Sequence, residues 1–221
     1  MSPLWKRAAR STLRAGMRCH LRTRSRPLTM SAADSLMIVS PHPDDDVLGC
    51  GGLIQTALAQ QAAVRIVYLT DGGASHPGHP VLDPTRLARQ RKAEAAAATN
   101  HLGLRADNLV FLGGTDGTLD HLPPSEGDRL TAGIAAEIDR FAAQIIAAPC
   151  RTDGSSEHDA AFGLLTAALA RNLSRPRVLE FPVWAWWNPL RLPRAVGGRQ
   201  IWRLALGHQG EIKRQALAEH R

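Results

Sequence analysis

From residue 35 onward the chain alternates short apolar segments with longer segments of helical pattern. The apolar segments have the length of buried strands and lie at 35–40, 64–70, 108–112, 143–148 and 177–183. The segments of helical pattern lie at 51–61, 84–102, 127–141 and 158–172. Strands that alternate with helices are joined by crossovers, which makes the strands parallel and places helices on both faces of the sheet. The sequence therefore predicts an α/β, Rossmann-like fold with a mostly parallel sheet.

The first 29 residues differ from the rest of the chain in charge. They contain eight basic residues and no acidic ones, so leaving them out changes the formal net charge from +7 to −1. No nucleic-acid partner is therefore expected for the folded domain. The head could be a disordered arm that binds nucleic acid or anionic lipid, a targeting segment, or a stretch upstream of a true start at Met30. We predict that residues 1–30 are a basic extension, disordered or non-native, and that residues 31–221 form one domain, which could be truncated at its C-terminus.

Hydropathy and cysteine content limit the class of protein further. No apolar run approaches the roughly 18 residues that a membrane-spanning helix needs, so no transmembrane segment is expected. The three cysteines are too few and too scattered for a disulfide framework or a thiolate zinc site. This usage is typical of a reducing compartment, and we expect a cytoplasmic protein. No pattern in the sequence indicates an oligomeric state.

The segment 40–52 carries the strongest chemical signal. Its sequence is SPHPDDDVLGCGG, and it follows the first strand directly. It therefore places His42, Asp44, Asp45 and Asp46 at the carboxyl end of a strand, where open α/β sheets build their sites. Imidazole and carboxylate oxygens are good ligands for Zn²⁺, and a carboxylate that does not bind the metal can act as a base. The alternative, an acidic turn that caps the next helix, needs neither the histidine nor the prolines.

Polar residues also follow the other predicted strands. After the second, third and fourth strands these are Asp71, Asp116, Arg151, Asp153, Glu157, His158 and Asp159. A tryptophan cluster with Asn188 follows the fifth strand. Any one Asp-Gly pair is typical of an ordinary turn. Because parallel strands end at the same edge of a sheet, we expect these distant segments to line one pocket.

Taken together, these segments resemble the PIG-L/LmbE-like family of metal-dependent de-N-acetylases, which remove acetyl groups from N-acetylglucosamine-type sugars. The resemblance runs from residue 35 to about residue 221. It is most specific at HPDDD in 42–46, which is similar to the family's His-Pro-Asp-Asp-Glu signature. Weaker blocks follow in the family's order: LTDG at 69–72, RKAE at 91–94, LG at 102–103, LG at 112–113, DGTL at 116–119 and EHDAA at 157–161.

The resemblance implies hydrolysis of the N-acetyl group of an N-acetylglucosamine-type sugar or conjugate. It implies that His42, Asp45 and His158 bind the metal, and that Asp44 is the general base for a metal-bound water. Two histidines and one carboxylate leave a fourth position open, as in catalytic zinc sites, so Zn²⁺ is the expected cofactor. Fe²⁺ also fits such a ligand set. The expected partner is a small amino-sugar substrate.

Two positions depart from the family's pattern. Asp46 stands where the family usually has Glu, which keeps the charge and shortens the reach. Ser155 stands where the family commonly has a His that is associated with stabilising the tetrahedral intermediate, and a hydroxyl supplies no positive charge. Candidates to stand in for that His are His76, His79, His121 and Arg151. Two alternatives therefore stay open: a catalytically degenerate member that binds sugar or metal, and a related amidase that acts on a different conjugate.

Four residues are predicted to contact substrate. The resemblance has Arg91 facing the substrate, although an exposed salt bridge along its own helix would explain it equally well. Asp116 and Asp71 are placed for contacts with sugar hydroxyls, or serve only in turns. Trp184 and Trp186 alternate along a segment that we expect to be extended, which puts both rings on one face. Trp184 could then stack on a pyranose ring, or pack in the core or against another subunit.

Overall fold

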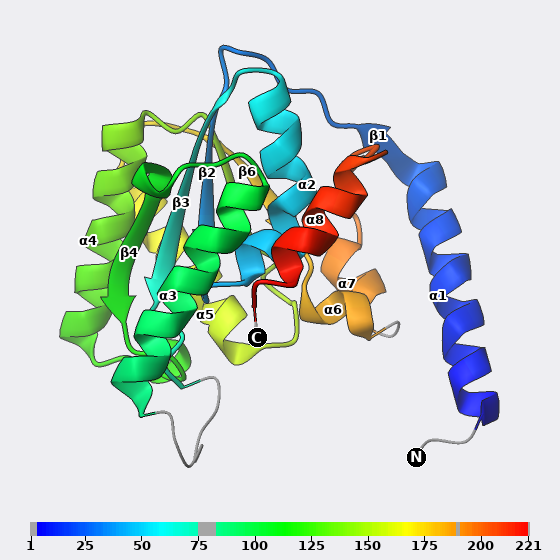
Figure 1. Ribbon diagram of the computed structural model, residues 1–221, viewed down its shortest axis with the longest axis horizontal. Coiled ribbons are helices and arrows are strands. Elements are labelled where there is room, and N and C mark those ends of the chain that lie inside the picture. Colours follow the sequence, from blue (N-terminus) through cyan, green and yellow to red (C-terminus); the bar gives the residue numbers. More distant parts are fainter. Residues whose placement is uncertain (1–3, 75–82, 189–190, 221) are drawn as a thin grey trace.

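A five-stranded parallel sheet forms the centre of the molecule (Figure 1) in the computed structural model, which describes residues 4–74, 83–188 and 191–220. The strands lie in the order β4-β3-β2-β5-β6. Their bounds are β2 (Ser35–Ser40), β3 (Ala63–Thr70), β4 (Leu109–Gly114), β5 (Ile145–Pro149) and β6 (Arg177–Phe181). Every pairing between neighbours in this sheet is parallel. The predicted fold class is confirmed, with strand ends that differ from the predicted ones by a few residues.

Helices cover both faces of the sheet. The longer ones are α2 (Asp45–Ala59), α3 (Pro84–His101), α4 (Pro124–Phe141), α5 (Ser156–Arg171) and α8 (Gln209–Leu217). Short helical segments are η1 (Ala106–Asn108), η2 (Leu119–His121), α6 (Trp184–Trp187) and α7 (Leu192–Val196). Successive side chains of β2 point to opposite faces. Leu36 and Ile38 pack in the core with α2 and α3, and Met37 and Val39 pack in the core with α4 and α5.

Helix α2 begins at Asp45, not at Gly51 as the sequence predicts. The predicted start lay too late because three glycines in this stretch lower its helix propensity. One of them is required by packing, since a Cβ on Gly49 would lie 2.0 Å from the ring of Phe181. Carboxylates in the first turn also favour a helix here, because they interact with its positive end. The acidic motif is thus part of the first turn of α2.

The tryptophan segment is a turn of helix, so the predicted extended conformation is wrong. Residues 184–187 form α6, in which side chains two positions apart do not share a face. The rings of Trp184 and Trp187 are 56% and 60% exposed. Trp186 instead packs against a small apolar cluster that includes Leu192.

The basic head contains a helix and a short strand. Residues 4–24 form helix α1 (Leu4–Arg24), which is drawn in blue at the edge of the molecule (Figure 1). The next residues form β1 (Ser25–Pro27), which pairs in parallel with β7 (Ile201–Arg203). Leu21 is buried in the small cluster near α7, and Met30 is buried in the core that α2 covers. Contacts with distant segments therefore involve residues 21–30, and the disordered or non-native extension over residues 1–30 stays a prediction. The domain boundary at residue 31 and the start at Met30 stay predictions.

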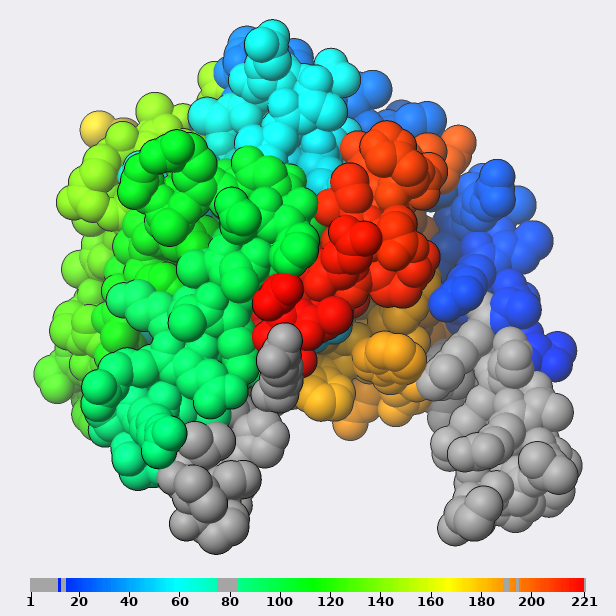
Figure 2. Space-filling model, in the orientation of Figure 1, coloured from blue at the N-terminus to red at the C-terminus, as the bar shows by residue number. Residues whose placement is uncertain are grey.

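Helix α8 packs against both α2 and α3, and Figure 2 shows this last segment, in red, wedged between them. The Lys213 ammonium group donates a hydrogen bond of 2.8 Å to the carbonyl oxygen of Leu48 in α2. His101 of α3 lies 2.9 Å from the carboxylate of Glu219. These contacts bring the residues that follow α8 to the sheet edge where the site lies. Within the described residues, no helix combines the length and apolar character that crossing a membrane requires.

Candidate metal centre

The candidate site lies at the topological switch point of the sheet, between two neighbouring strands from which the chain continues in opposite directions. β2 and β5 are neighbours in the sheet, but the chain leaves β2 toward β3 and reaches β5 only after β4. The segments that follow β2 and β5 therefore diverge, and open α/β sheets bind ligands in the crevice that this leaves. His42 follows β2, and His158 lies in the first turn of α5, which follows β5.

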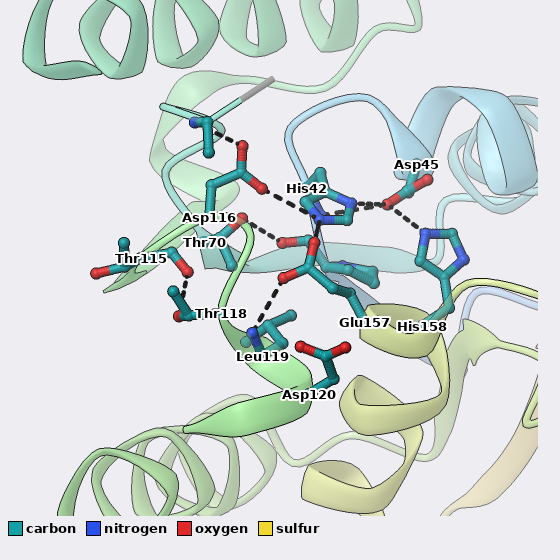
Figure 3. Close-up of polar contacts among 12 residues, drawn as sticks. His42, Asp45, Thr70, Thr115, Asp116, Thr118, Leu119, Asp120, Glu157 and His158 are labelled. Carbon is teal, nitrogen blue, oxygen red and sulfur yellow. Dashed lines mark hydrogen bonds and ion pairs between the residues drawn. The ribbon is translucent and has the colours of Figure 1, made fainter. Parts of the chain in front are cut away.

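His42, Asp45 and His158 form a group whose ligand atoms all lie close enough together to hold one metal ion (Figure 3). Asp45 Oδ2 lies 3.0 Å from His42 Nδ1 and 3.2 Å from His158 Nε2. Ligands with bonds of about 2.0–2.1 Å to a tetrahedral zinc ion lie roughly 3.3 Å apart, so the spacing fits. His158 is fully buried, and within the described residues the one polar atom that its Nε2 faces is Asp45 Oδ2, at 3.2 Å. A buried nitrogen that faces a carboxylate and a second imidazole in this way is what a metal ligand needs.

Each of the two imidazoles is held from behind by a further carboxylate. The Nδ1 of His158 lies 2.7 Å from Asp153 Oδ2, and the Nε2 of His42 lies 2.7 Å from Glu157 Oε2. Such carboxylates fix the tautomer and orientation of ligating histidines, and they raise the basicity of the nitrogen that faces the metal. Sequence reasoning placed Asp153 and Glu157 at the sheet edge but gave them no role. The positions of Asp153 and Glu157 in the sequence, five residues and one residue before His158, do not show which imidazole each carboxylate contacts.

Asp153 also determines the local backbone. It is fully buried, and it accepts backbone N–H groups from three consecutive residues, Val183, Trp184 and Ala185, at 2.9–3.0 Å. Three consecutive N–H groups can point at one carboxylate only if the chain turns, and this is the start of α6. The same carboxylate thus holds a candidate ligand and positions Trp184.

The electrostatics of the centre favour a bound cation. Burial would lower the pKa of His42, but hydrogen bonds to Asp45 and Glu157 outweigh burial and raise it to about 10. Burial also opposes the charged form of His158, yet Asp153 and Asp45 raise its pKa to about 9. Burial would raise the pKa of Asp45, but the two imidazoles hold it well below its ordinary value. These carboxylates therefore require nearby positive charge, which protons on the imidazoles or a divalent cation can supply.

Asp44 does not cap α2. It occupies the N-cap position, but its side chain makes no capping hydrogen bond. Its carboxylate instead lies 2.9 Å from the guanidinium of Arg91, which α3 contributes and which is almost completely buried. The capping role that is the ordinary explanation for such an aspartate is thus not observed. The guanidinium of Arg91 also lies 4.0 Å from Glu94 one turn along its own helix, and its role toward substrate stays a prediction.

The other predicted substrate contacts lie at the same edge, with different surroundings. Asp116 Oδ1 lies 3.3 Å from His42 Nε2, and its second oxygen accepts a backbone N–H at 2.8 Å (Figure 3). Burial raises the pKa of Asp116. Asp71 accepts the backbone N–H two residues further along at 2.8 Å, which is a turn contact. Trp184 donates its backbone N–H to Asp153 and leaves its ring exposed. Their roles in substrate binding stay predictions.

The shortened acidic residue Asp46 does not face the candidate metal ligands. It is fully buried, and its Oδ2 accepts a hydrogen bond of 3.0 Å from the hydroxyl of Tyr68. Its other oxygen has no partner among the described residues. Burial raises its pKa to about 7. The replacement of the family's usual Glu by Asp46 therefore affects the packing between α2 and β3, where Tyr68 lies.

Two of the four proposed substitutes for the missing histidine are engaged elsewhere. Arg151 donates a hydrogen bond of 2.7 Å to Glu180. His121 is exposed and pairs with the carboxylate that precedes it in the chain. His76 and His79 lie outside the described residues.

A histidine that sequence reasoning missed lies near the general-base candidate. Neither ring nitrogen of His220 has a hydrogen-bond partner within the described residues, and both are buried. Burial lowers the pKa of His220, while the charges of Asp44 and Arg91 act on it in opposite directions. It thus lies within electrostatic reach of both. No motif could have indicated this, because it depends on how α8 packs between α2 and α3.

Fold and site together define an α/β protein with a candidate two-histidine, one-carboxylate metal centre at the carboxyl edge of a parallel sheet. A family model described as PIG-L: GlcNAc-PI de-N-acetylase matches residues 37–169. The chain belongs to this family, which confirms the predicted resemblance and makes it a hydrolytic N-deacetylase. No curated protein sequence matches the chain.

Three solved structures illustrate the likeness. The conserved protein TT1542 from Thermus thermophilus is 27% identical, with a TM-score of 0.58, over 83% of this chain and 77% of the other. The N,N'-diacetylchitobiose deacetylase from Pyrococcus horikoshii is 18% identical, with a TM-score of 0.65, over 85% and 70%. A zinc-inhibited form of the teicoplanin deacetylase Orf2 is 21% identical, with a TM-score of 0.58, over 84% and 83%. The last two, below 25% identity, show a shared fold.

Proposed function

We propose that this protein is a metal-dependent deacetylase of an N-acetylglucosamine-type sugar or conjugate. The observation that carries the proposal is the set of His42, Asp45 and His158, in which both imidazoles face one Asp45 oxygen and each imidazole is held on its other nitrogen by a further carboxylate. A divalent metal in this set would act as a Lewis acid and make a water molecule acidic enough to be used at neutral pH. Zn²⁺ is the proposed metal because it favours such donors, and Fe²⁺ is the main competitor.

Asp44 is the proposed general base. It is next to the candidate ligand Asp45 in the chain, makes no capping hydrogen bond and keeps 29% of its side chain exposed. It would accept the proton of the attacking water and return a proton to the departing amine. Arg91 would orient the carboxylate through the contact at 2.9 Å. Because this contact uses only part of the guanidinium, Arg91 can also reach the substrate, as the family resemblance implies.

The substrate-side proposal uses Asp116, Asp71 and Trp184. Asp116 would accept a hydrogen bond from a sugar hydroxyl beside His42, and the exposed indole of Trp184 would cover one face of the pyranose. Asp71 would line the same wall. Support for an amino-sugar comes from the family, whose description names an N-acetylglucosaminyl lipid, and from the chitobiose deacetylase that shares the fold. A cytoplasmic location also stays a proposal, resting on cysteine usage.

The missing histidine at Ser155 leaves one catalytic role without its usual residue. We include His220 in the proposal as a group that fills part of it, as a neutral imidazole that donates a hydrogen bond, since its ring nitrogens have no described partner and burial lowers its pKa. His220→Gln should then lower kcat, while Ser155→His in that variant should restore part of it. If His220→Gln leaves kcat unchanged, the role belongs elsewhere.

The test is metal content measured together with acetate release. Wild type, Asp44→Asn and the exposed control Asp107→Asn would be assayed on N-acetylglucosamine, its dimer and N-acetylglucosaminyl-inositol conjugates. We expect about one metal per chain in all three proteins, and a loss of roughly 10²–10⁴ in kcat for Asp44→Asn alone. Metal binding without acetate release from any substrate would favour the degenerate-member or other-amidase alternatives. A folded, zinc-supplemented protein without bound metal would overturn the proposal.

A further inference from the structure

A second cleft, with a volume of about 790 Å³, lies between α1, α7, β7 and the carboxyl end of β6. None of the candidate metal ligands lines it, so it is separate from the metal centre. Its volume is in the range of small-molecule binding sites, roughly 300–1,000 Å³. The question is what chemistry its walls and rim would accept.

The walls of the cleft are apolar. They are built mainly by leucine, phenylalanine, tryptophan and alanine side chains from α1, α2, β6, α7 and β7. Leu21, Phe181, Leu192 and Ala195 are buried residues that line it. Polar side chains among the lining residues, such as Ser25 and Gln200, are fewer than the apolar ones, so an apolar chain finds more contact there than a sugar does. The interior therefore suits a hydrocarbon chain.

The charged residues that line the cleft are unbalanced. They are four arginines and one glutamate, Glu180. Glu180 is already occupied, because it accepts hydrogen bonds from the guanidinium groups of Arg151 at 2.7 Å and Arg199 at 2.6 Å. Arg18 and Arg22, one turn apart on α1, are exposed and pair with no carboxylate of the described residues. An anion at the mouth of the cleft would therefore meet unpaired positive charge.

We propose that this cleft binds a single-chain amphiphile with a carboxylate head, that is, a long-chain fatty acid. The hydrocarbon chain would lie against Leu21, Phe181 and Leu192. The carboxylate would lie at Arg18 and Arg22, since guanidinium groups bind carboxylates through charge-assisted, often paired hydrogen bonds. A concave, largely apolar cleft with exposed arginines on α1 fits one chain better than it fits the flat surface of a bilayer.

The first test is isothermal titration calorimetry with dodecanoate, below its micelle concentration. Butanoate tests the need for the chain, and dodecyltrimethylammonium tests the sign of the head group. We expect dodecanoate to bind with about one site per protein, and the other two probes to bind at least about ten-fold more weakly. Equal binding of dodecanoate and dodecyltrimethylammonium would show plain hydrophobic adsorption and overturn the proposal.

Two variants locate the site. Arg18→Glu/Arg22→Glu reverses the rim charge on the exposed side of α1 and should weaken dodecanoate binding about ten-fold or more. The matched control is Arg86→Glu/Arg89→Glu, which reverses two exposed arginines of α3 that do not line the cleft and should leave the affinity unchanged. Ala195→Trp places a ring in the cleft and should abolish binding, with circular dichroism and acetate release as checks that the protein is folded. If dodecanoate binds both the charge-reversed and the ring-filled variants as it binds wild type, the cleft is not the site.

Discussion

Replacing Asp153 by Asn tests whether the carboxylate behind His158 organises the metal centre. Asp153 Oδ1 faces the N–H groups of Val183 and Ala185 and the thiol of Cys150 at 3.6 Å, and Oδ2 faces the N–H of Trp184 and His158 Nδ1. An asparagine has only one oxygen, so its NH₂ group must face one of these pairs. If it faces the first pair, two buried backbone donors lose their acceptor. If it faces the second, one backbone donor does, and His158 must move its proton to the nitrogen that faces the metal.

Each buried donor without an acceptor costs about 1–3 kcal/mol, and the amide takes the orientation that loses one backbone donor, so Asp153→Asn should lower the free energy of unfolding by roughly 1–3 kcal/mol. Metal affinity should fall about 10–100-fold, because the imidazole is no longer held in the ligating tautomer. Urea unfolding of chelated protein measures the first effect, and competition with a chromogenic chelator measures the second. The control Asp107→Asn changes an exposed carboxylate and should stay within about 0.5 kcal/mol. A loss below about 0.5 kcal/mol for Asp153→Asn with unchanged metal affinity would refute this reasoning.

Three further predictions concern groups around the two sites. Arg91→Gln should lower kcat about ten-fold without changing metal content, because Asp44 loses its only described charged contact; equal activity in Arg91→Gln and wild type would argue against that role. Burial opposes the charged form of Glu180, but hydrogen bonds from Arg151 outweigh it and lower the pKa below 4.5. Charged Glu180 therefore adds stability at pH values above its unfolded-state pKa, and this stability is lost as the pH falls through its folded-state pKa. Glu180→Gln should lower the free energy of unfolding by about 1–2 kcal/mol at pH 7, measured by urea unfolding. If the difference between variant and wild type persists at low pH, the ion pair is not its source. Gly49→Ala should lower the free energy of unfolding by about 1–3 kcal/mol, and with it the melting temperature, because the new Cβ would lie 2.0 Å from Phe181. Gly163→Ala, which has open space around it, should instead raise the free energy of unfolding by about 0.5–1 kcal/mol.

The sequence predicted the sheet and the edge at which the site lies, for physical reasons that are local. Apolar runs of strand length and the alternation with helices define a parallel sheet, and a parallel sheet gathers the residues that follow its strands. His42 and Asp45 are three residues apart, so one tight turn brings them together. The family resemblance implied His158 as the third ligand, and the structure shows it in the first turn of α5, which follows the strand next to β2.

What the sequence could not give depends on contacts between distant segments. Periodicity shows which face of an element is apolar, but it does not show that Glu157 contacts His42 or that Arg91 contacts Asp44. The helical turn at Trp184 was missed because Asp153, thirty-one residues earlier, is what bends the backbone there. The short strand β1 was not predicted for the same reason, since it pairs with β7 near the other end of the chain.

The arrangement separates metal binding from turnover, which bears on the departure at Ser155. Asp153 and Glu157, which hold the two imidazoles, lie on either side of Ser155 in the chain. These three residues and His158 all fall in the six-residue segment 153–158. Ser155 itself occupies the N-cap of α5 but makes no capping hydrogen bond. Exchanging His for Ser at this position therefore leaves both supporting carboxylates and all three candidate ligands in place. It follows that the chain should keep a complete metal centre whatever its catalytic rate, so that metal content alone cannot distinguish an active deacetylase from a degenerate one. Only acetate release, compared between Ser155→His and wild type, addresses that difference.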